Sequence, residues 1–585
     1  MVGIVGGTVS GSSLSSMVEL LDREPWYDTE RYERGDAGVA LVSHGAKDPA
    51  GRDASAGDGA AGVLHGAITN RAALGLEGPA LFRALVDRPS AVLPRADGPF
   101  LAAAVDDTGE RLTLATDTLA TRPGYYAETP GGIVFGSELK AVADRLPDPQ
   151  LDEAAAGDLV SFGYVLGEKT LVEGVRALPP GSLLRYDDGE VSVRRYWSPE
   201  LGRASVDGYV DDTVDRYRTA VDRTADTLDG RVGVWLSGGL DSRALAGVLR
   251  EAYGPFRTIT YDSNPSDGSN LAPAREVADH LGVENSVVEM RPGDPAETLG
   301  KAIDATDGMV AWHVVHNPGF VFDGLHDAVD VILEAAPQGE LFGEDIWLHN
   351  MMDSATPAEA ISRSFPHLSA EETRAVVDAD VDPEASIADA VADSEKSTQA
   401  NRVQDTWFRT FLSNSHFRGN RVYRSQVGMR VPFTDRAFLD HVGKMPHERF
   451  RQDTFPLSGG RVPRAMSPLK RDVIVALDDD LASIPYERTG VAPKRPLALH
   501  DAAYVLKHLK WQVTGRPVRW LDWYREDDRV RETIDDWLDR AAARPVLEAD
   551  GVADLRDRLR DGDPGALAPV AGVTSLAVWT ERYLD

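Results

Sequence analysis

The spacing of hydrophobic residues changes near residue 200, which divides the chain into two regions of different predicted structure. Up to residue 195, short apolar runs alternate with turns rich in Gly, Pro and Asp, as in GVALVSHG, PFLAAAVDDTGERLTLATD and GGIVFGSE. This pattern is typical of β-strands joined by tight turns. The sequence DDGE (187–190) separates two alternating runs and predicts a hairpin.

Beyond the linker-like segment SPELGRASVDG (198–208), the period becomes helical, with Val210, Val214, Tyr217 and Val221 on one face. Strands are predicted at 232–236, RTITYD (257–262), SVVEM (286–290) and AVDVILEAA (328–336), and a helix at APAREVADHLG (272–282). Strands that alternate with helices predict a parallel, doubly wound sheet. The acidic stretch 354–400 predicts peripheral helices, and the region from about Asp501 is also predicted to be helical.

Composition narrows the classes of partner. Among 585 residues, 94 acids oppose 62 bases, which gives a net charge of −32. Nucleic acid and anionic membranes both require a basic surface, so neither is expected as a partner. Acids spread along the chain and few Lys beside Arg are typical of a protein from a high-salt cytoplasm. A solvated acidic shell explains this charge better than an acidic binding surface does.

The chain contains no cysteine, which excludes disulfides, thiolate zinc sites, Fe–S clusters and cysteine nucleophiles. The start MVGIVGGTVSGSSL lacks the basic region and long apolar core of a signal peptide. No apolar run approaches the roughly 20 residues of a membrane span. These features predict a cytoplasmic protein.

One loop carries a candidate chemistry. SGGLDS (237–242) lies where the strand at 232–236 is predicted to enter a helix. Glycines allow backbone N–H groups to approach a phosphate, and a helix N-terminus adds partial positive charge. Asp241 could hold Mg²⁺. The loop matches neither a Walker motif nor G-x-G-x-x-G. A turn that needs glycine only for packing is the alternative, which the co-occurrence of Ser, Gly, Asp and Ser disfavours.

SGGLDS resembles the pyrophosphate loop of the ATP-pyrophosphatase superfamily, whose members split ATP to AMP and pyrophosphate. Together with GGIVFGSELKAVA, LPPGSLLRY, ELFG and RVPFTD, it makes the chain similar to asparagine synthetases. The resemblance implies an α+β, amidotransferase-like β-sandwich domain at 1–195. An α/β doubly wound parallel-sheet ATP-pyrophosphatase domain at 206–585 would follow. A homodimer is compatible with it.

The N-terminal half departs from the family where glutamine is hydrolysed. The family's nucleophilic Cys at position 2 is Val2 here, and a valine cannot form a thioester. The glutamine-holding NGEIYN motif reads HGAITN (65–70). Hydroxyls of Thr8, Ser12 and Ser13 have no base beside them in any recognisable pattern. We therefore expect an inactive glutaminase domain.

In the C-terminal half the resemblance assigns the ATP contacts to Leu236, Ser237, Gly238, Gly239, Asp241, Ser242 and Tyr261. The family's SGEGSDE signature becomes EAAPQGE (334–340), in which Glu340 is kept as a candidate catalytic residue and Gly339 replaces an acid. Glu344 or Asp345 could replace the lost metal ligand, and a solvated acidic turn is the alternative.

Two further assignments have competing explanations. The family's catalytic lysine corresponds either to Lys470, the only lysine nearby, or, in the simplest register, to Ser467. A surface lysine at 470 is the alternative. His313 and His316 are spaced as a metal pair, but no third ligand signature accompanies them, which favours structural or substrate-lining histidines.

Three functions follow. The first is an ATP- and Mg²⁺-dependent ligase that adenylates a small-molecule carboxylate and joins it to ammonia or an amine. β-Lactam synthetases, which close a ring with an internal amine, also lack the nucleophilic Cys. The second is a catalytically inactive homologue that binds a nucleotide or a partner. The third, sulfur transfer to RNA, is disfavoured by the missing cysteines and the acidic charge.

Overall fold

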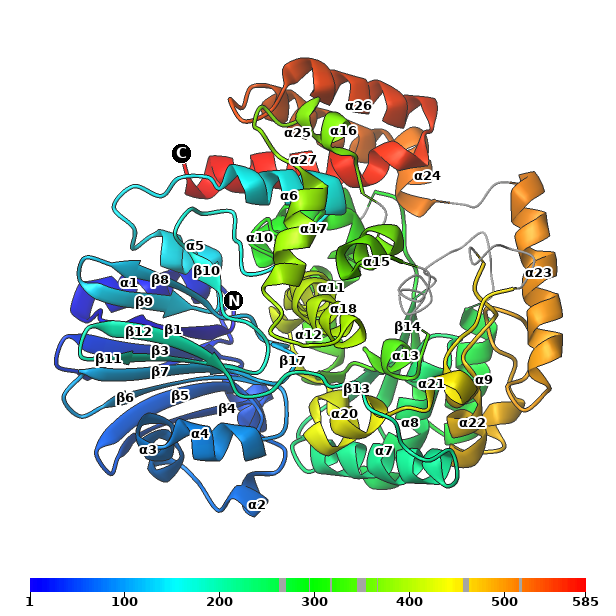
Figure 1. Cartoon of the computed structure of the whole chain (residues 1–585), viewed down its shortest axis with the longest axis horizontal. Coiled ribbons are helices and arrows are strands. Elements are labelled where there is room, and N and C mark those ends of the chain that lie inside the picture. The colour runs from blue at the N-terminus through cyan, green and yellow to red at the C-terminus, as the bar shows by residue number, and fades with distance from the viewer. Residues whose placement is uncertain are drawn as a thin grey trace.

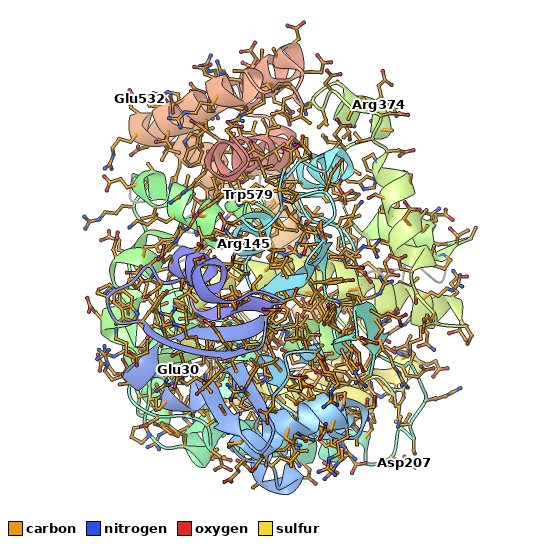
Figure 2. The ribbon with its side chains drawn as sticks, turned by 90° about the vertical axis from the view of Figure 1, so that its left-hand side faces the viewer. Glu30, Arg145, Asp207, Arg374, Glu532 and Trp579 are labelled. Carbon is orange, nitrogen blue, oxygen red and sulfur yellow. The ribbon has the colours of Figure 1, made fainter. Side chains whose placement is uncertain are left out.

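The computed structural model describes the chain apart from residues 262–269, 294, 316–317, 345–353, 366, 456–461 and 515–517. Figure 1 shows the β-rich N-terminal part beside a mixed region that carries the parallel sheet, with the last helices lying above both. Figure 2 gives the same arrangement from the side of the N-terminal sheets. None of the helices in the described part of the chain combines the length and apolar character that a bilayer crossing requires.

The N-terminal region contains two antiparallel sheets of six strands each. The first has the order β10-β8-β9-β1-β3-β2 and the second β12-β11-β7-β6-β5-β4. Their bounds are β1 Gly3–Gly7, β2 Asp28–Arg34, β3 Ala37–Ser43, β4 Arg52–Gly57, β5 Ala60–Gly66, β6 Phe100–Asp106, β7 Arg111–Thr116, β8 Tyr125–Thr129, β9 Gly132–Gly136, β10 Arg176–Ala177, β11 Ser182–Asp187 and β12 Glu190–Arg195. The predicted β-sandwich is confirmed.

Alternating side chains of the two sheets meet in one buried core that includes Val39, Leu101 and Phe135. Helices cover the outer faces: α1 (Gly11–Leu21) packs on β1 and β3, and α3 (Pro79–Asp87) packs on β5 and β6. The predicted hairpin joins β11 to β12. Asp188 and Gly189 at its tip both have positive φ, as a type I′ turn requires.

The C-terminal region contains a five-stranded parallel sheet in the order β15-β14-β13-β16-β17. Its strands are β13 Val232–Trp235, β14 Arg257–Tyr261, β15 Glu284–Val288, β16 Val331–Leu333 and β17 Gly428–Arg430. The connecting helices include α7 (Tyr209–Ala225), α8 (Asp241–Ala252) and α9 (Leu271–Leu281), which confirm the helical spacing of the sequence. The sequence did not indicate β17.

This strand order fixes where a ligand can bind. The chain leaves β13 on one side toward β14 and β15, and then crosses back to β16 on the other side. Such an order is that of a doubly wound sheet, in which the reversal opens a crevice at the carboxyl ends of the central strands. The loops that follow β13 and β16 therefore face each other.

The remaining described helices lie around these sheets. The acidic stretch forms α15 (Pro357–Ser364), α16 (Ala370–Arg374), α17 (Pro383–Ala392) and α18 (Gln399–Trp407). Three of them are not merely peripheral, because Ile361 of α15, Ile387 of α17 and Val403 of α18 belong to the main core. The last part of the chain forms α23 (Leu497–Thr514), α24 (Arg519–Glu526), α25 (Asp528–Ala542), α26 (Ala549–Asp561) and α27 (Leu567–Tyr583).

The helix α27 packs against α6 (Glu153–Phe162) of the N-terminal region, as Figure 1 shows. The contact is close, since a Cβ on Gly572 would lie 2.6 Å from the carbonyl oxygen of Leu159. One hydrophobic cluster accordingly includes both Leu159 and Val573. The C-terminal helices share a core with the N-terminal region, and the predicted boundaries at 195 and 206 stay a prediction.

Buried charges join the two sheet systems. Arg430, at the end of β17, donates to both carboxylate oxygens of Asp48 at 2.6 and 3.0 Å. Arg122 donates to the carbonyl oxygen of Met429, and Arg424 donates to that of Thr121. Burial alone would raise the pKa of Asp48, but Arg430 outweighs this effect and lowers it. The N-terminal region is thus held against the edge strand of the parallel sheet.

We predict that Asp48→Asn strongly destabilises the protein, because Arg430 would be left charged, fully buried and without its carboxylate. Loss of one member of a buried pair costs about 3–5 kcal/mol. The matched control is Asp107→Asn, which removes the carboxylate of the exposed pair with Arg34 and should cost less than about 1 kcal/mol. Urea unfolding midpoints measure both. Equal midpoints for the two variants would show that the buried pair does not join the regions.

Candidate active site

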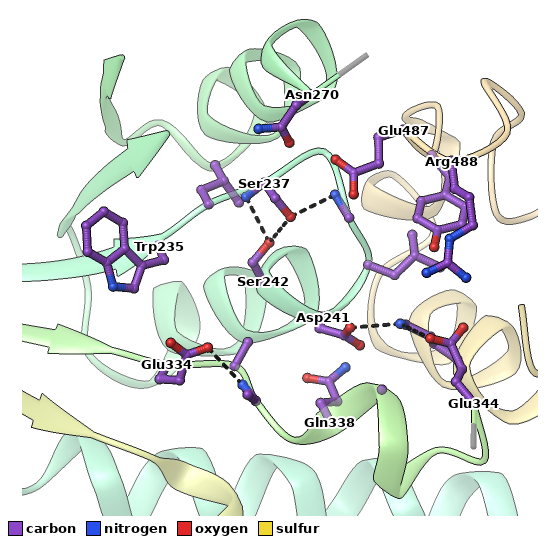
Figure 3. A pocket seen from close by; sticks show the side chains of 18 of the residues that line it. Trp235, Ser237, Asp241, Ser242, Asn270, Glu334, Gln338, Glu344, Glu487 and Arg488 are labelled. Atoms are coloured by element: carbon purple, nitrogen blue, oxygen red, sulfur yellow. Dashed lines mark hydrogen bonds and ion pairs between the residues drawn. The ribbon is translucent and has the colours of Figure 1, made fainter. Parts of the chain in front are cut away.

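A cavity of about 490 Å³ opens at the carboxyl ends of β13, β14 and β16, where the strand order reverses. Figure 3 shows the loop after β13 on one side and the segment after β16 on the other. The lining residues are Trp235, Leu236, Ser237, Gly239, Leu240, Asp241, Ser242, Ile259, Tyr261, Asn270, Glu334, Ala335, Ala336, Gln338, Gly339, Glu340, Glu344, Lys470, Tyr486, Glu487 and Arg488.

The glycine loop is shaped by its own side chains. The backbone N–H of Ser237 donates to Ser242 Oγ at 3.1 Å, and that of Gly239 donates to Ser237 Oγ at 3.0 Å. The N–H of Gly238 donates to Asn270 Oδ1 at 2.6 Å. These bonds keep the loop curled over the start of α8, whose N-terminus adds partial positive charge at the edge of the cavity.

Arg243 fastens the loop from behind. This buried guanidinium donates to the carbonyl oxygens of Leu481, Ile484 and Pro485, and at 3.3 Å to that of Gly238. The backbone N–H of Glu487 also donates to the oxygen of Gly238. The segment that carries Tyr486, Glu487 and Arg488 is thereby fixed beside the glycine loop.

A buried lysine joins three segments of the site. Lys470 Nζ lies 2.8 Å from Asp241 Oδ2 and 2.7 Å from Glu344 Oε2, and its side chain is 3% exposed. It belongs to α22 (Pro468–Leu477), whose first turn is capped by Ser467. Burial alone would lower the pKa of Lys470, but the two carboxylates outweigh it and raise the pKa above its ordinary value.

Several polar atoms of the site are buried and have no partner among the described residues: Asp241 Oδ1, Glu344 Oε1 and Gln338 Nε2. Gln338 is fully buried, and its Oε1 accepts a hydrogen bond from Tyr217 at 2.8 Å. Two unpartnered carboxylate oxygens suit a hard cation such as Mg²⁺, and an unpartnered amide N–H suits a phosphate or carboxylate oxygen. The donor set therefore fits Mg²⁺ and an oxyanion.

The residues singled out from the sequence converge here. Leu236, Ser237, Gly239, Asp241, Ser242, Tyr261, Glu340 and Lys470 all line the cavity. Gly238 is not among the lining residues but holds the loop through Asn270. The alternatives of a surface lysine at 470 and a solvated turn at 344 are both wrong, because Lys470 is 2% exposed and Glu344 is paired with it.

Other expectations fall elsewhere. Asp345 and His316 lie outside the described residues. His313 does not line the cavity, and burial lowers its pKa to about 4. Sequence reasoning missed Asn270, Gln338, Arg243 and Glu487. Only Gln338 had a usable signal, since it lies within the altered stretch 334–340 that follows a predicted strand.

The expected glutamine site is closed. Val2 is 6% exposed, and it lines two cavities of about 10 Å³ each. His65, Arg122 and Arg424 line both cavities as well. A cavity of about 10–15 Å³ holds one water molecule, so neither has room for an amino acid.

Comparisons with known proteins agree with this architecture. The family model described as asparagine synthase matches residues 215–455, and the model described as glutamine amidotransferase domain matches residues 80–197. The first covers the glycine loop, the altered stretch and β17, but ends before Lys470.

Named relatives are distant. The glutamine-hydrolyzing asparagine synthetase 3 of Bacillus subtilis is 23% identical over 78% of this chain and 74% of its own length. Asparagine synthetase 1 of the same organism is 27% identical over 39% of this chain, and the aligned part spans only 37% of that relative. The carboxyethyl-arginine beta-lactam-synthase of Streptomyces clavuligerus is 28% identical over 35% of this chain and 39% of its own.

A pH dependence follows from Glu340. Burial, reinforced by nearby Asp241, raises the pKa of Glu340 from 4.5 to about 7. Between these values the folded protein holds a proton that the unfolded chain has lost, so the contribution of Glu340 to stability is greatest below its unfolded pKa and declines as the pH rises.

We predict that Glu340→Gln, which cannot titrate, gains stability relative to the parent as the pH rises from about 4 to about 8, by on the order of 2 kcal/mol. Urea unfolding in EDTA at several pH values measures the difference. A difference between parent and variant that does not change with pH would contradict the raised pKa.

Proposed function

Because the chain belongs to the asparagine synthetase family, we propose that it is an ATP-dependent amide-forming ligase that takes nitrogen from free ammonia or an amine. The observation that carries this proposal is the cavity at the strand reversal. There the SGGLDS loop, Lys470 and the carboxylates of Asp241, Glu340 and Glu344 all meet. The closed pocket around Val2 supports a nitrogen source other than glutamine hydrolysed on the same chain.

The proposed chemistry has two steps. A carboxylate oxygen of the acceptor attacks the α-phosphorus of ATP, and the bond from that phosphorus to the pyrophosphate oxygen breaks. The amine nitrogen then attacks the activated acyl carbon, AMP leaves, and the nitrogen loses a proton. The acceptor need not be aspartate, because the stretch Glu334–Gly339 differs from the family signature that contacts the substrate.

Each residue has a proposed task in these steps. The N-terminus of α8 faces the leaving pyrophosphate, and Lys470 neutralises negative charge that develops on it. Mg²⁺, which Asp241 would hold, supplies further charge neutralisation when bound. Glu340, with a pKa of about 7, is suited to accept the proton that the amine releases.

The deciding assay measures AMP release from ATP with aspartate and other amino-acid or sugar carboxylates, each with ammonium or with glutamine. We expect AMP with ammonium, or with a carboxylate that carries its own amine, and none with glutamine as sole nitrogen source. If no carboxylate supports AMP release, the result would favour an inactive homologue that binds a nucleotide or a partner. Turnover of the purified chain with glutamine alone would overturn the nitrogen source.

We predict that the purified protein releases no glutamate from glutamine, because Val2 has no nucleophilic atom and its pocket admits about one water. A coupled glutamate dehydrogenase assay measures the product, with Val2→Ala as the comparison. Glutamate release by the parent above that variant would reveal a nucleophile other than residue 2.

We predict that Asp241→Asn lowers ATP turnover by about 100-fold or more, as expected when a preorganised charge in a closed site is removed. Asp211→Asn, an isosteric change on the exposed face of α7, should leave turnover within about twofold, since surface changes away from a site alter little. If both variants keep parental turnover, the glycine loop is not the pyrophosphate site.

A further inference from the structure

Glu344 lies opposite the glycine loop although it comes from a separate segment. It follows α13 (Gln338–Leu341), and the backbone N–H of Glu344 donates to the carbonyl oxygen of Gly339. This turn directs its side chain back into the cavity, where Figure 3 shows it across from Asp241. Its side chain is 11% exposed, and Lys470 bridges the two carboxylates.

Each carboxylate uses one oxygen for Lys470 and keeps the other without a described partner. Those oxygens, Asp241 Oδ1 and Glu344 Oε1, are both hidden from solvent. Buried carboxylate oxygens without partners are unfavourable unless a hydrogen-bond donor or a cation binds near them.

The absence of a side chain at Gly339 makes this arrangement fit. A Cβ there would lie 3.3 Å from Glu344 Oε2, 3.4 Å from Asp241 Oδ2 and 3.5 Å from Lys470 Nζ. Position 339 therefore points at the centre of the charged group, and a side chain there would compete for space with Glu344. Glycine at position 339 therefore leaves free the space that the side chain of Glu344 occupies.

We propose that Glu344 is the second carboxylate ligand of the Mg²⁺ held by Asp241, and that it replaces an acidic side chain at position 339. The inference rests on the proposed use of ATP at this site. It adds that the site keeps two carboxylates of different origin, one from the glycine loop and one from the segment after α13. Glu340 and Glu487 also line the cavity, but the ion pairs of Lys470 are with Asp241 and Glu344.

The test is a titration of the full chain with Mn²⁺, followed by electron paramagnetic resonance, in the presence of α,β-methylene ATP. We expect Glu344→Gln to weaken Mn²⁺ binding by at least about tenfold, since even outer-shell groups contribute about 10–100-fold to metal affinity. Asp211→Asn is the control, because it removes one carboxylate from the exposed face of α7, outside the cavity, and should leave the affinity within about twofold.

The double variant Gly339→Asp/Glu344→Gln separates a lost ligand from a damaged fold. It returns a carboxylate at the position that faces Asp241, so we expect it to recover most of the Mn²⁺ affinity. Thermal melts of all variants establish that they are folded. If the double variant binds Mn²⁺ no better than Glu344→Gln, the claim that Glu344 replaces an acidic side chain at position 339 is overturned.

The outcomes also separate this inference from the proposed function. If the parent binds Mn²⁺ with the nucleotide analogue and Glu344→Gln binds it equally well, the ligand assignment is overturned while use of ATP stands. If the parent binds neither analogue nor Mn²⁺, the proposed function fails and the inference fails with it. Both results come from binding measurements alone, so neither requires that the acceptor carboxylate or the ligase activity be known.

Discussion

The ion pairs of Lys470 are the interaction on which the rest of the site depends. They join the loop after β13, the segment after β16 and the helix α22, although Lys470 lies 229 residues from Asp241 and 126 from Glu344 in the sequence. A lysine this deeply buried keeps its charge only because both carboxylates face it. The strand reversal brings the first two segments together, and Lys470 fixes how far apart their carboxylates lie. The geometry of the proposed pyrophosphate and metal sites follows from that spacing.

A second set of buried charges explains why a closed amidotransferase-like domain still matters to the protein. Arg430 ends β17, the edge strand beside β16, and pairs with Asp48 of the N-terminal region. The backbone N–H of Glu334 donates to the carbonyl oxygen of the same Arg430. The N-terminal region therefore supports β16 and β17 next to the cavity, a structural role that does not require glutamine binding.

Much of this could be predicted from local sequence. The hairpin at Asp187–Glu190, the helix α7 and the strands β13, β14 and β16 have periodicity or turn signals that depend on near neighbours only. The glycine loop was recognisable because its residues are consecutive. By contrast, the three residues of β17 are too few to show a period. The burial of Lys470 and the positions of Asn270 and Gln338 depend on contacts across the sheet, which no local pattern encodes.

Exchange of radiolabelled pyrophosphate into ATP, dependent on an added carboxylate, tests the central claim most directly. It detects adenylation at this cavity without requiring that the nitrogen source be known. We expect exchange with at least one carboxylate of the amino-acid or sugar class, and its loss in Lys470→Met. Exchange that persists in Lys470→Met, or its absence in the parent with every carboxylate, would contradict an adenylating site built around this lysine.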